Sequence, residues 1–181
     1  MFTVIAYLFV MGLEYSANGE SLLYKVLFGF VRQLIGRKVE HFCCEADILD
    51  FGFSGGFVLH AMGCSRVVQD NDILVTTIDY LSWDEKESTN NDEWYNMSRL
   101  RDRVIGGTAV SVLVSPLNDL KVRLDNGVTI ECLIANAYPH FSDGEIEQWV
   151  LFEYTKVFSG RFLTVYNKEV DFSDHSGSNE D

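Results

Sequence analysis

Histidine and cysteine are the residues of this chain best able to bind a metal ion or to act in catalysis, but their spacing supports neither role. The 181-residue sequence contains four of each: His41, His60, His140, His175, Cys43, Cys44, Cys64 and Cys132. There is no HxxxH or HExxH pair, as in metallohydrolases, and no CxxC pair, as in zinc modules. We therefore expect no metal ion and no cofactor.

Two cysteine–histidine pairs could in principle supply a nucleophile and its general base. Cys64 with His60, or Cys132 with His140, would have to approach within hydrogen-bonding distance in the fold. The spacing does not require either approach, so we interpret these side chains as ordinary core and surface residues. The sequence accordingly predicts a protein that is not an enzyme.

The remaining cysteines are neighbours in a run typical of a β-strand. The side chains of Cys43 and Cys44 should therefore point to opposite faces of a sheet. Four cysteines in 181 residues are too few for a disulfide framework. This usage favours reduced thiols and a cytoplasmic protein.

A second group of candidate residues is acidic and is interleaved with aromatic side chains. Its members are Asp79, Trp83, Asp84, Glu85, Glu87, Asp92, Glu93, Glu145 and Glu147. Exposed aromatic rings among carboxylates are suited to binding a basic protein, and we expect Trp83 to be the exposed anchor. The alternative is that the acids belong to a solvated loop and that Trp94 and Trp149 lie in the core.

The overall charge fits an acidic binding protein. The formal net charge is −13, from 27 acidic and 14 basic residues. Nucleic acid is disfavoured as a partner, because neutralising its phosphates requires clustered lysine and arginine. A basic partner, or a simple need for solubility, accounts for the charge. With 47% hydrophobic residues, the chain has ample material for a packed interior.

The apolar run at residues 1–15 needs a separate interpretation. It is shorter than the roughly 20 residues that cross a bilayer, and no basic residues precede it as in a signal peptide. We expect residues 1–20 to form an apolar N-terminal extension of the domain and expect no membrane partner.

Two stretches read as helices that end at glycine. Ser21 is suited to cap the first helix and Asn91 or Asp92 the second, and Gly36 and Gly106 can end them with a positive φ. The apolar stripes of the two helices are Leu23, Leu27, Phe30, Val31 and Leu34, and Trp94, Met97, Leu100 and Val104. The other face of the second helix carries Arg99, Arg101 and Arg103.

A strand and a hairpin should follow each helix. The strands are expected at 38–44 and 109–115, and the hairpins turn at Ser54-Gly55-Gly56 and Asp125-Asn126-Gly127. Asn-Gly between alternating apolar residues is the strongest short hairpin signal. Further strands are expected at residues 73–78, 148–155 and 161–167.

These matching stretches predict an internal duplication with a shift of about 70 residues. We expect an α+β protein in which units at about 21–80 and 91–167 form one largely antiparallel sheet or a partly closed barrel, with the helices packed on it. The duplicated domain should span 21–172, and residues 173–181 should form a disordered acidic tail.

The repeated unit resembles a family of small bacterial proteins. The residues that carry the resemblance are Leu34-Ile35-Gly36, Ile48 to Phe53, Asp119 to Gly127, and Glu147-Gln148-Trp149. Some members act as immunity proteins of polymorphic toxin systems, including contact-dependent growth inhibition. The resemblance implies a cytoplasmic protein that binds and neutralises a cognate toxin domain, which is expected to be basic and could be a nuclease. The resemblance does not identify any functional residue in this chain.

Two other functions stay open at this point. The chain could be a non-enzymatic ligand-binding or structural module of another bacterial pathway, which a defined apolar pocket between the repeats would favour. A hydrolase that uses Cys64 or Cys132 with a nearby histidine is the third possibility.

Overall fold

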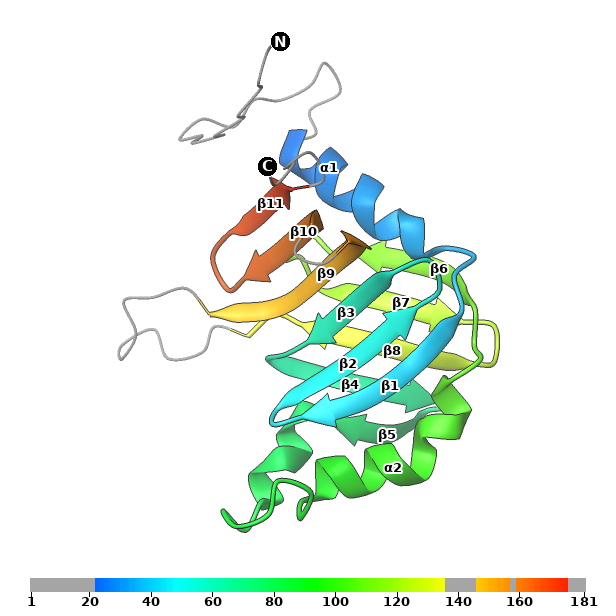
Figure 1. Ribbon diagram of the computed structural model, residues 1–181, viewed down its shortest axis with the longest axis vertical. Helices are drawn as coiled ribbons and strands as arrows, with labels where there is room; N and C mark the ends of the chain where they lie inside the picture. Colours follow the sequence, from blue (N-terminus) through cyan, green and yellow to red (C-terminus); the bar gives the residue numbers. More distant parts are fainter. Residues whose placement is uncertain (1–21, 136–145, 157–158, 176–181) are drawn as a thin grey trace.

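The computed structural model describes residues 22–135, 146–156 and 159–175, and in these ranges eleven strands form two antiparallel sheets (Figure 1). The expected α+β class with mainly antiparallel pairing is confirmed. The expected single sheet or partly closed barrel is wrong, because the strands divide between two sheets and the structure is not closed into a barrel.

Each sheet combines strands from both halves of the chain. The first has the order β1 (Val39–Glu45), β2 (Ile48–Phe53), β3 (Phe57–Ala61), β9 (Glu147–Lys156), β10 (Ser159–Tyr166) and β11 (Val170–Asp174). The second has the order β5 (Asp72–Thr76), β4 (Cys64–Gln69), β8 (Val128–Leu133), β7 (Leu120–Leu124) and β6 (Ala109–Val114).

A short connection after β3 carries the chain from the first sheet into the second. Only Met62 and Gly63 separate β3 from β4, and Gly63 has φ +58°, which L side chains rarely adopt. A Cβ on Gly63 would lie 2.7 Å from Oε1 of Gln148, so a side chain at this position would force the Gln148 amide to move. Both edges of β3 are occupied, by β2 and by β9, so β4 pairs with β8 in the second sheet.

The helices lie at opposite ends of the molecule (Figure 1). Helix α1 (Leu22–Val31) continues into a 3-10 turn, η1 (Arg32–Leu34), and α2 (Asp92–Val104) follows a second 3-10 helix, η2 (Thr77–Ser82). Gly36 and Gly106 follow the helices with φ +84° and +94°, as predicted. Helix α2 packs against β1 and β5, an edge strand of each sheet. Its three arginines are exposed, also as predicted.

Both predicted hairpins are present, as β2–β3 and β7–β8. The predicted strand at 73–78 is β5, but it ends at Thr76 and the chain turns into η2. Two strands were not predicted, β4 and β11. Because β11 runs to Asp174, the predicted start of the tail at Ser173 is wrong. The predicted extension at 1–20 and the tail beyond residue 175 lie outside the described residues.

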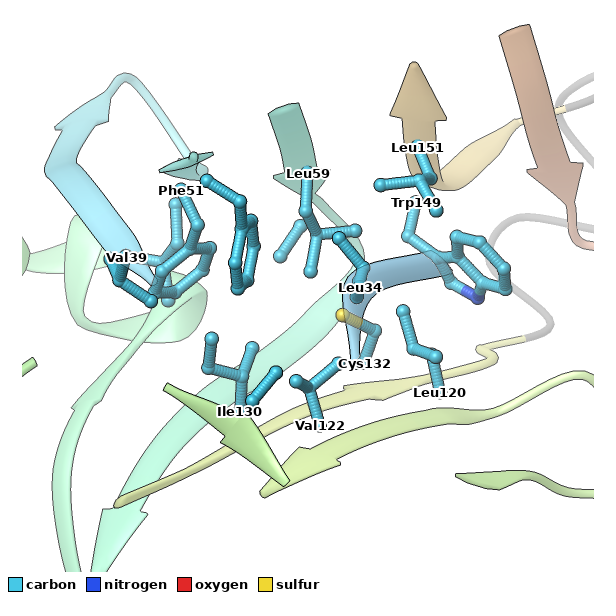
Figure 2. Close-up of a cluster of buried hydrophobic side chains, with 14 of the residues drawn as sticks. Leu34, Val39, Phe51, Leu59, Leu120, Val122, Ile130, Cys132, Trp149 and Leu151 are labelled. Atoms are coloured by element: carbon cyan, nitrogen blue, oxygen red, sulfur yellow. The ribbon is translucent and has the colours of Figure 1, made fainter. Parts of the chain in front are cut away.

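The core fills the space between the sheets. Figure 2 shows Phe51, Leu59 and Leu151 of the first sheet facing Val122 and Ile130 of the second, and all five are buried. Strands β2 and β7 alternate between buried and more exposed residues, so one face of each supplies the core and the other faces outward. The outward face of the first sheet does not contribute to this core and can therefore hold polar side chains.

Candidate functional site

The acidic candidates from 79 to 92 lie in one connector, which comprises η2, the loop 83–91 and the first turn of α2. Asp79 is fixed at the start of η2 by a reciprocal cap. Its backbone N–H donates to Oγ1 of Thr76 at 3.2 Å, and its own Oδ2 accepts from the Thr76 N–H at 3.0 Å. The half-buried Asp79 carboxylate is thus committed to holding the local structure.

Hydrogen bonds inside the loop give it a defined shape. The Asp84 carboxylate accepts from the N–H groups of Lys86 and Glu87 at 3.0 and 3.3 Å and from Nδ2 of Asn90 at 2.7 Å. The bond from Lys86 contributes most to lowering the pKa of Asp84 below its usual value, followed by the bond from Asn90. The loop therefore holds Asp84 in its ionised form.

Trp83, the predicted exposed anchor, is half-buried and supports the loop from inside. Its indole N–H donates to the carbonyl of Glu87 at 2.8 Å, and its ring stacks on Tyr80 at a centroid distance of 5.5 Å. The first contact lies within the loop and the second joins the loop to η2, so the ring contributes chiefly to the shape of the connector.

The start of α2 is tied to the same connector. Oδ1 of Asn91 accepts from the N–H of Trp94 at 2.8 Å, which makes Asn91 the N-cap and confirms one of the two predicted caps. The N–H of Asp92 donates to Oγ of Ser82 at 2.7 Å, so the two ends of the connector meet.

Both apolar and acidic side chains are exposed on the outside of the connector. We define the connector surface as the exposed residues Ile78, Leu81, Asp84, Glu85, Glu87, Asp92, Trp94 and Tyr95. Leu81 is 83% exposed and Tyr95 61%, and an open depression of about 290 Å³ lies beside Tyr95 and Trp94. The alternative interpretation, in which Trp94 lies in the core, is wrong for this residue, since its side chain is 38% exposed.

Glu93 does not belong to the connector surface, although it was one of the predicted partner-binding residues. Its side chain is fully buried, and neither carboxylate oxygen has a hydrogen-bond partner among the described residues. Burial, and then the nearby charges of Asp47 and Asp79, raise its pKa to about 8. Glu93 is consequently a neutral, interior carboxylic acid at pH 7.

The predicted candidates near Trp149 are not joined to the connector. Glu147 is exposed at the start of β9, which lies apart from α2 and the connector in Figure 1. Glu145 lies outside the described residues. Trp149 itself is fully buried, as expected for a core residue.

The cysteine–histidine pairs considered as nucleophiles are not assembled as such in the described part of the chain. Cys132 is buried, and burial raises the pKa of its thiol to about 12. His140 lies outside the described residues. His60 is paired with Asp50, at 2.8 Å between Nε2 and Oδ2, on the first sheet, whereas Cys64 begins β4 in the second.

The structure also assembles a polar cluster that sequence reasoning missed. His41, Cys43, Asp50 and His60 meet on the outward face of β1, β2 and β3. Cys44 points the other way and packs against the core, as predicted from its adjacency to Cys43. The sequence signal for this cluster was the spacing of His41 and Cys43, which lie two residues apart on one strand and therefore on one face of the sheet.

Burial is the main cause that raises the pKa of the Cys43 thiol, followed by the negative charges of Asp50 and Glu45, and Arg101 opposes them. The thiol is therefore protonated at neutral pH, which disfavours a role for Cys43 as a free nucleophile.

Neither described helix has the length and apolarity that a membrane-spanning helix requires. Comparison of the chain with protein-family models, with curated protein sequences and with solved structures finds no match.

Proposed function

We propose that this chain is a cytoplasmic binding protein that captures a basic protein domain through the connector surface, and that this domain is a cognate toxin which binding neutralises. The observation that carries the proposal is that Leu81, Tyr95 and four carboxylates are all exposed on the hydrogen-bonded connector. The resemblance of the repeated unit to immunity proteins supports the choice of a toxin as partner.

The physics of association favours this surface. A net charge of −13 accelerates encounter with a basic protein, since complementary charge raises association rates by roughly 10-fold to 1000-fold at low salt. Apolar and aromatic side chains then supply most of the binding energy once water is excluded. The internal hydrogen bonds of Asp84 and Trp83 reduce the entropy lost when the loop is held by a partner.

We further propose that the scaffold is the duplicated unit expected from the sequence. In the first sheet the order β1-β2-β3 is followed by β9-β10, and in the second β6-β7-β8 is followed by β4-β5. The two orders correspond if β9-β10 of the second unit is equivalent to β4-β5 of the first. Register shifts at Val39/His41 and Ala109/Ser111 occur at matching places. The connector joins these units and supplies the binding surface.

The test is binding of the purified chain to the basic product of its neighbouring gene across a salt series. The double variant Glu85→Lys/Glu87→Lys should slow association by about 10-fold at low salt, because it reverses charge on the connector. The variants Leu81→Ala and Tyr95→Ala should speed dissociation and weaken binding by about 10-fold each, which corresponds to a loss of about 1.4 kcal/mol.

The matched control is Glu40→Lys/Glu147→Lys, which changes the net charge equally at exposed positions on β1 and β9. It should retain most of the affinity. Equal losses in the connector and control variants would contradict the connector surface as the interface. Absence of any captured basic protein, with the chain folded, would contradict the proposed function and favour a ligand-binding or structural module. Growth protection during co-expression with the toxin domain should follow the same order of variants.

A further inference from the structure

The polar cluster on the first sheet is assembled by strand register. Cys43 on β1 lies directly opposite Asp50 on β2, and Asp50 lies opposite His60 on β3. His41 precedes Cys43 by two residues, so both side chains leave the same face of β1. The neighbouring core residue Phe42 points inward. Three adjacent strands therefore present a thiol, two imidazoles and a carboxylate on one outward face.

The distances within the cluster suit a small metal ion. Nε2 of His41 lies 3.1 Å from Sγ of Cys43, and the ligand atoms of His41, Cys43 and Asp50 all lie within 4.8 Å of one another. In a tetrahedral zinc site, bond lengths of about 2.0 to 2.3 Å place the ligand atoms about 3.3 to 3.8 Å apart. Side-chain rotations that shift the ligand atoms by about 1 Å would bring the three atoms to a common centre.

Two neighbours hold the cluster in position. Nε2 of His60 contacts Oδ2 of Asp50 at 2.8 Å, and the His60 ring packs edge-on against Phe152 at a centroid distance of 4.8 Å. Phe152 is in turn stacked on Phe162. An imidazole fixed between an aromatic ring and a carboxylate is the kind of support that orients a ligating carboxylate in metal sites.

A glycine opposite His41 provides the space that its side chain uses. Gly52 pairs with His41 across β1 and β2, and a Cβ on Gly52 would lie only 3.0 Å from the His41 Cβ. A larger residue at this position would force the two strands or the histidine to move. The glycine thus permits His41 to lie beside Cys43.

We propose that His41, Cys43 and Asp50 bind one zinc ion, that His60 holds the Asp50 carboxylate in place, and that a water molecule takes the fourth position. Thiolate and imidazole ligands favour zinc over calcium or magnesium, which prefer oxygen ligands alone. Binding transfers the thiol proton of Cys43 to solvent, and the thiolate and the carboxylate then balance the two charges of the ion. Glu45 adds negative charge nearby, and Arg101 partly offsets it.

The first test uses Co²⁺ as a spectroscopic substitute for zinc, with tag-free protein kept reduced. One equivalent of Co²⁺ should give a thiolate-to-cobalt charge-transfer band, and Zn²⁺ should abolish the band by displacement with one-to-one stoichiometry. Cys43→Ser should lose the band, whereas Cys64→Ser, a half-buried cysteine on β4, should keep it. Absence of the band from the wild-type protein would overturn the proposal.

The second test measures Zn²⁺ affinity by competition with a chromogenic chelator. Cys43→Ser and His41→Ala should each weaken binding by at least about 100-fold, and His60→Ala, which removes only the supporting contact, by about 10-fold. Gly52→Ala should weaken binding while all four polar residues remain. Equal affinities for wild type and Cys43→Ser, with both folded by circular dichroism, would overturn the site. No partner protein is needed, so this outcome is independent of the proposed toxin binding.

Discussion

Replacing Glu93 with glutamine is expected to make the protein more stable, relative to wild type, as the pH rises. The difference in free energy of unfolding between the variant and wild type should be about 4 to 5 kcal/mol larger at pH 8 and above than it is below about pH 4.5. The carboxyl group has a pKa of about 8 when folded, against an ordinary value of 4.5. Between these values the folded state holds a proton that the unfolded state has released. The free energy of unfolding of the wild-type protein therefore falls as the pH rises, by about 1.4 kcal/mol per unit from this group.

Glutamine does not ionise, so Glu93→Gln should remove this part of the pH dependence. Urea denaturation at a series of pH values from about 4 to about 9 measures the free energy of unfolding of the two proteins. This range includes the pKa of the Glu93 carboxyl group in the folded state, about 8, and in the unfolded state, about 4.5. Glu147→Gln is the matched control, because it removes an exposed glutamate and should preserve the wild-type slope. Parallel curves for wild type and Glu93→Gln would contradict a buried, neutral Glu93.

Truncating Trp149 to alanine should destabilise the protein by about 3 to 5 kcal/mol. The indole is fully buried between the sheets (Figure 2), and its N–H donates to the carbonyl of Asn118 at 2.9 Å. The variant leaves a cavity and an unpaired carbonyl in the loop before β7. For a chain of this size the midpoint of thermal unfolding should fall by about 6 to 20 °C.

Two further variants distinguish the contribution of ring packing to stability from two other effects. These effects are the loss of the indole hydrogen bond and the removal of a tryptophan at any position. Trp149→Phe keeps most of the buried ring but lacks the N–H donor, and it should cost less than the alanine variant, about 1 to 3 kcal/mol. Trp94→Ala removes a partly exposed indole from α2 and should cost about 1 kcal/mol or less. A thermal midpoint for Trp149→Ala equal to that of Trp94→Ala would contradict the packing described for the core.

The features that were predicted correctly depend on neighbours in sequence. Gly36 and Gly106 end the helices because a positive φ is available to glycine, and Asn91 caps α2 with its own side chain. Asn126 and Gly127 form the turn of the β7–β8 hairpin for the same local reason. Each of these signals is complete within a few residues.

Strand β4 was missed because its buried positions are not all apolar. Ser65 is 2% exposed, and its N–H donates to Oγ1 of Thr77 at 3.1 Å. Thr77 is itself buried and donates to the carbonyl of Gly63 at 2.6 Å. Polar residues that satisfy one another in the interior break the apolar alternation by which strands are recognised.

Glu93 shows how a helical pattern can be misread at a charged residue. It lies four residues before Met97, seven before Leu100 and eleven before Val104, and all four are buried on one face of α2. The helical spacing alone places Glu93 on the buried face of α2. The sequence prediction placed it at the surface because glutamate side chains are rarely buried. Helix α2 packs against β1, η2 and β5, and Glu93 is buried together with the apolar residues of the helix.

The sequence by itself determined the helix ends, the two hairpins and the acidic character of the chain, because these follow from local conformation and from composition. Only the tertiary structure decided that the strands divide between two sheets and that His41, Cys43, Asp50 and His60 meet on one face. Cross-strand pairing brings together residues that are far apart in sequence, and the register that selects these neighbours is set by the packing of the whole core.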